Sequence, residues 1–419
     1  MRALARAPWP LAVAALYLFS RVISTVILLA VAQTQPASPW GEARPSYLSY
    51  ISIWDAEWYQ RIFAVGYPDA VPRASDGSAR ANTWAFLPVF PLLVRAVAPL
   101  FGGGWMPAAS VVAVLAGLAA SLAMFALFER MMRKEAALWA TLLVLCCPVG
   151  LLFQAPYAEG LHVALLALVL LCLGTRRFFA AAPLILVAAL TRPTGAPMAL
   201  ALAVLALAWM RPAARARLSS SDFAGLMTAL VAAFAGALAW PVIAWLGTGE
   251  PSAYTDTETV WRGGPLELFQ PWAERARGLA GEGWWAVCLI LALGAAALLA
   301  APAVRRMGVT VWAWSASYIL YLAAVFDPQT STIRLLLPLF PLVGAAAVGW
   351  RSARISPLEG EAAQAARPRA GRSAGTSAGL AGAPWGLWAW LAVGVALQAV
   401  WVAVLWRWTE LPGGGDYPP

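Results

Sequence analysis

The sequence predicts an all-α fold, a polytopic bundle of about eleven transmembrane helices. Of its 419 residues, 61% are hydrophobic and 12% are charged, whereas a soluble domain is roughly half apolar and about a quarter charged. Apolar runs of about 17 to 25 residues recur from one end of the chain to the other, long enough to cross a hydrocarbon core of about 30 Å. Arginines gather in every second connection between these runs, which is typical of membrane proteins with a defined orientation.

The first apolar run, residues 11–32, is longer than the core of a cleavable signal peptide, so we interpret it as a retained helix. Further helices are expected at residues 107–128, 136–153, 158–174, 178–192, 194–210, 223–247, 284–302, 309–326, 333–350 and 385–406. Residues 85–101 are also apolar, but Pro88, Pro91 and Pro99 interrupt the hydrogen bonds of a helix. Because unsatisfied backbone is costly in lipid, this segment is expected to lie at the interface or to re-enter without crossing.

A cytoplasmic start places every basic cluster on the cytoplasmic side, as the positive-inside rule requires. The clusters are Arg2 and Arg6; Arg130, Arg133 and Lys134; Arg176 and Arg177; Arg211, Arg215 and Arg217; Arg305 and Arg306; and Arg351, Arg354, Arg367, Arg369 and Arg372. The same threading puts two long loops outside, residues 33–106 and 248–283. We therefore expect a multi-pass protein of the cell membrane with its active site on the extracytoplasmic side. The net charge of +9 orients the chain, and no nucleic-acid partner is expected.

The chain is expected to form one transmembrane domain, residues 1–350, which includes the external loop 33–106. A cytoplasmic linker at 351–384 follows, and then a last helix with an external tail at 385–419. The linker is rich in Ala, Gly, Ser and Arg, a composition typical of disorder. All the cysteines fall within apolar runs and His162 is the single histidine, so neither a disulfide framework nor a metal site is predicted. No cofactor is expected.

The polar residues of interest fall in connections that this threading places outside. Within residues 47–67, apolar side chains recur at helical spacing, which predicts a helix lying in the membrane interface. These side chains are Ile51, Trp54, Trp58, Ile62 and Val65. The aromatic residues of this segment suit the headgroup layer, a structural role that competes with a functional one. Asp55 and Glu57 are either ordinary carboxylates on a solvated face or members of a site.

Other ionisable residues are expected at the same membrane face. Glu159 and His162 lie three residues apart near the outer end of one helix, so they share a side. Arg192 lies in the turn TRPTG, and Arg334 follows DPQTS. Two arginines with a carboxylate suggest an anionic ligand that carries a phosphate, and a structural salt bridge between Glu159 and Arg192 is an equal alternative. Arg21, near the middle of the first helix, is expected to pair with an internal carboxylate or with backbone.

The segment WDAEWYQRIFAVGYP, residues 54–68, resembles the first-loop signature of bacterial PIG-V-type mannosyltransferases, which belong to the GT-C class of membrane glycosyltransferases. Four more segments resemble that family in the same order: AFLPVFPLLVR at 85–95, PYAEGLH at 156–162, LTRPTG at 190–195 and RLLLPLFPL at 334–342. The resemblance covers most of the chain from Trp54 to Leu342. Ala158 and Gly160 stand where relatives often have serines, and TRPTG replaces a more usual Ser-Asn pair, so the acceptor and the sugar stay open.

The resemblance implies transfer of a sugar, usually mannose, from a polyprenyl-phosphate carrier to a lipid or glycan acceptor outside the membrane, with inversion at the anomeric carbon. It places Asp55 at the family's catalytic position, where a carboxylate can take the acceptor's proton. Arg192 or Arg334 could stabilise the charge of the leaving phosphate, so a metal is not obligatory. The other candidate residues for donor or acceptor binding are Trp54, Glu57, Trp58, Tyr59, Tyr157 and Glu159.

Two other classes of function are left open by the sequence. A transporter or lipid flippase would use Arg21, Glu159 and Arg192 as substrate or coupling-ion sites. The long external loop with an interfacial helix favours the enzyme, because transporters usually keep such groups at the membrane midplane on broken helices. The third reading is a transferase-like scaffold without activity.

Overall fold

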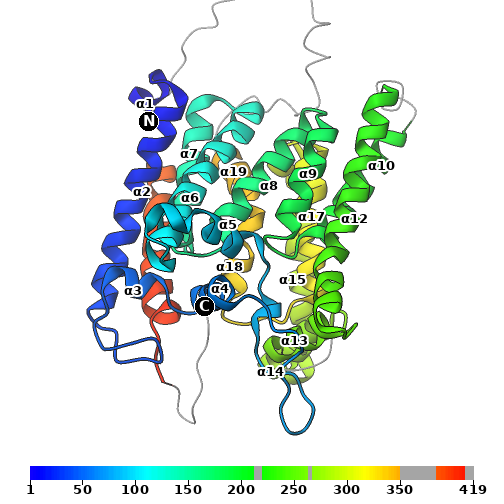
Figure 1. Ribbon diagram of the computed structural model, residues 1–419. Coiled ribbons are helices and arrows are strands. Elements are labelled where there is room, and N and C mark those ends of the chain that lie inside the picture. The colour runs from blue at the N-terminus through cyan, green and yellow to red at the C-terminus, as the bar shows by residue number, and fades with distance from the viewer. Residues whose placement is uncertain (212–218, 263–266, 350–383, 411–419) are drawn as a thin grey trace, which may run out of the picture.

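The structure is a computed structural model that describes residues 1–211, 219–262, 267–349 and 384–410. Within these ranges it contains helices and two isolated β-bridges but no β-strand, so the prediction of an all-α fold is confirmed. The long helices stand side by side as a bundle, and α3, α13 and α14 lie at the end opposite to α1 (Figure 1).

The first half of the chain, described over residues 1–211, contains ten α-helices, α1 to α10. The α-helices are α1 (Arg2–Arg6), α2 (Trp9–Ala32), α3 (Tyr47–Ile51), α4 (Asp55–Val65), α5 (Val89–Val97), α6 (Trp105–Met131), α7 (Lys134–Leu145), α8 (Glu159–Gly174), α9 (Phe178–Ala189) and α10 (Gly195–Met210). Short 3₁₀ helices separate some of them: η1 (Thr83–Ala85), η2 (Ala98–Phe101) and η3 (Gly150–Phe153).

The second half contains α12 (Ser220–Thr248), α13 (Ala253–Arg262), α14 (Gln270–Ala280), α15 (Trp284–Ala300), α16 (Pro302–Arg305), α17 (Val309–Val325), α18 (Thr332–Leu335), α19 (Phe340–Gly349) and α21 (Pro384–Trp401). Between them lie the 3₁₀ helices η4 (Gly281–Gly283) and η5 (Leu337–Leu339), and the π-helical turn η6 (Val402–Trp406) follows α21. The predicted linker at 351–384 lies outside the described residues except for Pro384, and the predicted tail is described only to residue 410.

Every apolar run that the sequence marks as a crossing is helical over most of its described residues. Five segments are long and apolar enough to cross a membrane by themselves: Trp9–Ala32, Trp105–Met131, Ser220–Thr248, Gln270–Ala300 and Trp385–Trp406. The other runs form shorter helices, so the number of crossings stays a prediction. The existence of the helices follows from the lengths of the apolar runs, since a helix is the one open-ended structure that satisfies its own backbone in lipid.

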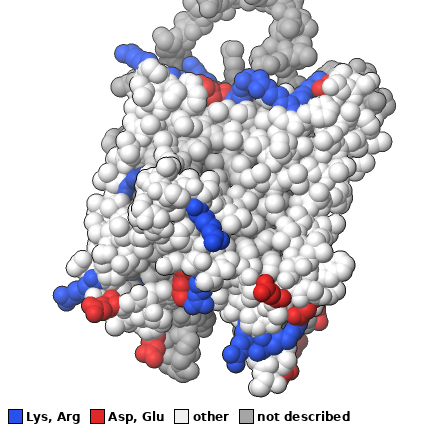
Figure 2. All heavy atoms as spheres, viewed as in Figure 1, with Lys and Arg blue, Asp and Glu red and all other residues white. Residues whose placement is uncertain are grey.

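The charge distribution matches a membrane protein. Figure 2 shows a broad band without charge, interrupted by few basic side chains, between two charged ends. Side chains of both signs occur at both ends, and basic side chains prevail at the end where α1 lies. Lys134 Nζ donates a hydrogen bond to Ala7 O (2.9 Å), which places this basic residue of the first predicted cytoplasmic turn beside the N-terminal segment. The two segments therefore lie at the same end of the bundle, and the side of the membrane that this end faces stays a prediction.

Arg21 lies inside the bundle and binds backbone carbonyls. Helix α7 ends at Leu145, which leaves carbonyl groups without helical partners in apolar surroundings. Arg21 Nη2 donates to Leu145 O (3.0 Å), and Arg21 Nη1 donates to Gly150 O (2.7 Å). The expected pairing of Arg21 with backbone is confirmed. Its guanidinium has a structural role, because it donates hydrogen bonds to backbone carbonyl groups that lipid could not satisfy.

The first long loop, residues 33–106, does not contain the continuous helix predicted over residues 47–67. Helices α3 and α4 are separated at residues 52–54, and Trp54 adopts φ 64° and ψ −124°, a conformation outside the helical range. Val65, expected on the apolar face, is 82% exposed. The prediction of one helix was wrong, because apolar spacing does not register a break in the backbone.

The segment at 85–101 does not form a long helix. It consists of α5, with 9 residues, and η2, with 4 residues, whereas a crossing needs about 20 residues. Helix α5 packs against α4 and α6. Helix α9, which the sequence marks as a crossing, is also short, with 12 residues, so the non-crossing position of this segment stays a prediction.

One close helix contact fixes a turn that carries a candidate residue. Helix α10 packs against α12 and α17. At Gly195, the first residue of α10, a Cβ atom would lie 2.3 Å from Ala237 N, so α12 could not approach if this residue had a side chain. Small residues have this role in membrane bundles generally. The contact anchors the preceding turn, in which Arg192 lies.

Candidate active site

A cavity of about 210 Å³ lies among α4, α8, α13 and α17, the turn before α10 and the segment around α18. Its wall combines charged, aromatic and aliphatic side chains. The charged residues are Asp55, Glu159, Arg192, Glu258, Asp327 and Arg334. A concave site with a few convergent polar groups among apolar ones is the usual form of a ligand site.

Asp55 enters the cavity from the first residue of α4. It is buried, with 8% of its surface exposed. The residue before it, Trp54, has a positive φ, and such a conformation costs a bulky residue about 1–3 kcal/mol. Contacts with the C-terminal part of the chain hold Trp54 in place, because its Nε1 donates to Trp406 O (2.7 Å) and Trp406 Nε1 in turn donates to Tyr50 O (3.0 Å).

Four ionisable side chains form an alternating row of charges. Arg334 forms ion pairs with Asp55 and with Glu159, the latter between Nη1 and Oε1 at 3.5 Å. Glu159 also pairs with Arg192. The exposed fractions of the side chains are 11% for Asp55, 9% for Arg334, 5% for Glu159 and 17% for Arg192. Residues from α4, α18, α8 and the turn before α10 thus meet, and each buried charge has an opposite partner, as burial requires.

The turn that carries Arg192 is fixed from α8. His162 Nε2 lies 3.0 Å from Thr194 Oγ1, and this hydroxyl donates to Arg192 O (3.2 Å). His162, Arg192 and Thr194 all line the cavity. Glu159 and His162 do share one side of α8, as their spacing predicts, and they hold the side chain and the backbone of the same turn.

Aromatic side chains form another wall of the cavity. Tyr59, Phe86 and Trp261 line it. Trp58 lies behind them, with its ring stacked on Phe86 (5.5 Å between centroids) and edge-on to Trp261 (5.7 Å). Burial raises the pKa of Tyr59, so its hydroxyl keeps its proton at neutral pH. The aromatic rings offer flat apolar surfaces beside the charged row.

The structure brings five of the nine predicted site residues to the cavity: Asp55, Tyr59, Glu159, Arg192 and Arg334. Trp54, Trp58 and Tyr157 stand behind its wall. Glu57 is directed elsewhere, because it accepts a hydrogen bond from Trp40 Nε1 (2.6 Å) and pairs with the exposed Arg61. The salt bridge between Glu159 and Arg192, the structural alternative, is formed, and both of its members also line the cavity.

Several lining residues escaped the sequence-based selection. Asp327, Gln329 and Ser331 belong to the turn after α17, where the motif DPQTS was the available signal. Glu258 and Trp261 lie on α13, and nothing in their local sequence indicates that α13 folds back over the site. Among the described residues, no three His, Cys, Asp or Glu side chains come together so as to hold a metal ion.

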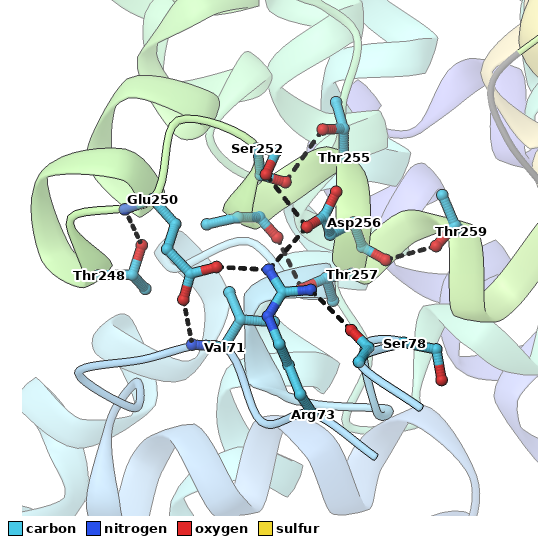
Figure 3. A network of polar contacts seen from close by, with 12 residues as sticks. Val71, Arg73, Ser78, Thr248, Glu250, Ser252, Thr255, Asp256, Thr257 and Thr259 are labelled. Carbon is cyan, nitrogen blue, oxygen red and sulfur yellow. Dashed lines mark hydrogen bonds and ion pairs between the residues drawn. The ribbon is translucent and has the colours of Figure 1, made fainter. Parts of the chain in front are cut away.

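Helix α13 is tied to the first external loop by a polar network (Figure 3). Arg73 reaches across from the loop, pairing with Glu250 and, through Nη2 to Oδ2 at 2.8 Å, with Asp256. Asn82 Nδ2 adds a buried hydrogen bond to Thr257 Oγ1 (3.0 Å). These contacts hold α13, and hence Glu258 and Trp261, against the cavity.

The Arg73 network is expected to open only in acid. The hydrogen bond from Arg73 lowers the pKa of Glu250 below its ordinary value, so the contribution of this pair is present above the unfolded pKa of about 4.3 and is lost as the pH falls through the lower folded value. Spin labels at Ser75 and Thr255, both exposed, should give a narrow distance distribution at pH 7 and at pH 5. The distribution should broaden below about pH 4.

The control for this measurement is Arg73→Gln, which should broaden the distribution already at pH 7. An unchanged distribution in Arg73→Gln would show that Arg73 does not hold α13 in place. Because the pair is partly exposed, high salt should also weaken it in the wild type.

Comparison with known proteins gives limited matches. No known protein family and no curated protein match the sequence. The structure is similar to crystal structures of ArnT from Cupriavidus metallidurans, one bound to undecaprenyl phosphate and one in the apo state. The sequence identities are 16% and 15%, and the TM-scores are 0.47 and 0.45. Each match covers 80% of this chain and 60% of the ArnT chain, so this chain spans about 60% of the length of those structures.

Proposed function

We propose that this protein transfers a sugar, mannose by its sequence resemblance, from a polyprenyl-phosphate donor to an acceptor hydroxyl at the external face of the membrane. The observation that carries the proposal is the meeting of Asp55 with two arginines in one cavity. A carboxylate supplies the base that the acceptor needs, and guanidinium groups suit the phosphate that departs. Undecaprenyl phosphate, bound in one ArnT structure, belongs to the proposed class of carrier.

The chemistry is a single displacement. The acceptor oxygen attacks the anomeric carbon, its proton passes to Asp55, and a new glycosidic bond forms. The bond between the anomeric carbon and the phosphate oxygen breaks, and polyprenyl phosphate leaves with the electron pair. The configuration at the anomeric carbon inverts, because attack and departure occur on opposite faces.

The two arginines are suited to different parts of this reaction. Arg334 touches Asp55 directly and has a side chain only 9% exposed, so it orients the carboxylate. Arg192 is the more exposed of the pair and contacts Glu159 through Nη2. A guanidinium has five N–H donors, which leaves Arg192 able to bind a phosphate oxygen as well. Charge that develops on the leaving phosphate would meet a donor already in position.

The transporter or flippase reading loses one of its supports. It relied on Arg21 as a buried functional charge, and Arg21 is engaged by the carbonyls of Leu145 and Gly150. Glu159 and Arg192 line one cavity together with Asp55. The geometry therefore favours the transferase.

The test uses purified protein in lipid nanodiscs with radiolabelled polyprenyl-phosphate mannose. Release of polyprenyl phosphate is expected, with mannose transferred to an added hydroxyl acceptor or, slowly, to water. Polyprenyl-phosphate glucose serves as the comparison for the choice of sugar. Absence of release from either donor across a panel of lipid and glycan acceptors would contradict the transferase. Movement of intact donor across a proteoliposome bilayer without release would support the flippase instead.

A further inference from the structure

The residue before Asp55 has an unusual backbone conformation. Trp54 has φ 64° and ψ −124°, close to the values of the first central position of a type II′ turn, where glycine is the usual residue. A tryptophan there is strained and keeps this conformation only if its surroundings impose it. The direction in which α4 starts, and with it the placement of Asp55, depends on this one residue.

A single buried hydroxyl, that of Tyr157, forms hydrogen bonds with the backbone on both sides of the strained residue. Tyr157 Oη accepts a hydrogen bond from Asp55 N (3.2 Å) and donates one to Ile53 O (3.1 Å). The peptide groups before and after Trp54 are thus tied to the same atom. Burial raises the pKa of Tyr157 well above its ordinary value, so the hydroxyl keeps the proton that it donates to Ile53.

The Tyr157 side chain is itself held from two directions. Its ring packs against Trp406 (5.3 Å between centroids), and the guanidinium of Arg334 lies 5.7 Å from the ring centroid. Tyr157 does not line the cavity. The direct contact with donor or acceptor that the sequence suggested is therefore replaced by contact with the backbone of Asp55 and with Arg334.

We propose that Tyr157 is a positioning residue: its hydroxyl holds the strained turn at Trp54 and thereby fixes where Asp55 meets the acceptor. The inference rests on the proposed function, because Tyr157 affects turnover only through Asp55. A displacement of about 1 Å in a reacting group can cost on the order of 100-fold in rate. Two hydrogen bonds made by a residue outside the cavity wall can therefore have a large kinetic effect.

The first experiment compares Tyr157→Phe with Tyr50→Phe. Phenylalanine keeps the ring that faces Trp406 and Arg334 but removes both hydrogen bonds, so kcat for sugar transfer should fall by about 10- to 100-fold. KM for the donor should stay within about threefold of the wild-type value, because the phosphate is bound elsewhere. Tyr50 is a matched control: it is fully buried and its hydroxyl has no hydrogen-bond partner. Wild-type kcat in Tyr157→Phe would overturn the proposal.

A double-mutant cycle separates positioning from general stability. If Tyr157 acts through Asp55, Tyr157→Phe should reduce the residual rate of Asp55→Asn by no more than about twofold. An equal loss in both backgrounds would overturn the proposal, since it would show that Tyr157 supports the fold or the substrate independently of Asp55.

Two readouts do not depend on activity. Hydrogen exchange at the Asp55 amide should become at least about tenfold faster in Tyr157→Phe, because its acceptor is gone. Trp54→Gly should melt at least about 2 °C above Trp54→Ala, since glycine alone adopts this φ without strain. Unchanged hydrogen exchange would contradict the hydrogen bond from Asp55 N to Tyr157. A higher melting temperature of Trp54→Ala would contradict the backbone strain at Trp54.

These readouts distinguish the inference from the proposed function. A wild-type protein without transfer activity would overturn the proposed function, while hydrogen exchange would still test the contact of Tyr157 with Asp55. An active wild type with an inactive Asp55→Asn and a fully active Tyr157→Phe would overturn the positioning role alone.

Discussion

Asp55→Asn is expected to lower sugar transfer by at least about 100-fold, the smaller end of the usual contribution of a general base. Asparagine keeps the size of the side chain and can still accept a hydrogen bond from Arg334, but it cannot take the acceptor's proton. Donor binding should survive, because the phosphate is assigned to Arg192. The measurement is transfer per mole of monodisperse protein, with donor affinity determined separately.

Removing one member of a buried ion pair commonly destabilises a protein by about 3–5 kcal/mol. Here the loss should be smaller, since Arg334 keeps Glu159 as a second partner at 3.5 Å. Melting temperatures of the wild type and the variant therefore belong in the same experiment. Near-normal transfer by a well-folded Asp55→Asn would contradict the catalytic assignment.

Glu57→Gln is the matched control, an acid-to-amide change two residues away on the same helix. Glu57 faces Trp40 and Arg61 and does not line the cavity. Its substitution should change transfer by no more than about threefold, because it removes only a partly exposed ion pair. If Glu57→Gln lowered transfer as much as Asp55→Asn, the loss in Asp55→Asn would have to be attributed to a disturbed loop and not to the missing base.

The second large effect is expected from Arg334→Lys and Arg192→Lys. Lysine preserves the charge but presents a single ammonium group, which cannot reproduce the fork of a guanidinium. Arg334 contacts both Asp55 and Glu159. Arg334→Lys should lower kcat by about 10- to 100-fold, because the Asp55 carboxylate would no longer be held in place. Arg192→Lys should chiefly weaken donor binding, by about tenfold, as expected for a lost charged hydrogen bond.

These variants are measured by donor titration and by initial rates at saturating donor. Arg61→Lys is the control, since Arg61 makes an exposed pair with Glu57 outside the cavity. Wild-type values of both parameters in both lysine variants would remove Arg192 and Arg334 from the site. A loss of donor affinity in Arg334→Lys with unchanged kcat would exchange the roles given to the two arginines.

Much of the architecture could be predicted from the sequence. The helices follow from the lengths of the apolar runs, because lipid forces the backbone to satisfy its hydrogen bonds locally. The arginines predict the side of the membrane on which the cavity lies. The sequence also allowed a prediction that several charged residues converge, because an unpaired charge is costly to bury and opposite charges at one membrane face lower that cost by pairing. These residues are Asp55, Glu159, Arg192 and Arg334.

The remaining features depend on contacts between segments far apart in the chain. The break at Trp54 arises from hydrogen bonds to Tyr157 and Trp406, and neither contact leaves a trace in the local apolar spacing. The approach of α13 to the cavity depends on Arg73 meeting Glu250 and Asp256, charges that look like ordinary loop residues in the sequence.

The sequence by itself thus determined most of the helical segments and several of the residues that line the cavity, and it predicted the side of the membrane on which the cavity lies. Local hydrophobicity and charge suffice for these properties, because each depends on the exchange of water for lipid along one segment. Only the tertiary structure decided that Asp55 enters the cavity while Glu57, two residues away, faces Trp40. That choice is set by the strained backbone at Trp54, which persists because the hydroxyl of Tyr157, 102 residues after Asp55 in the chain, holds it in place.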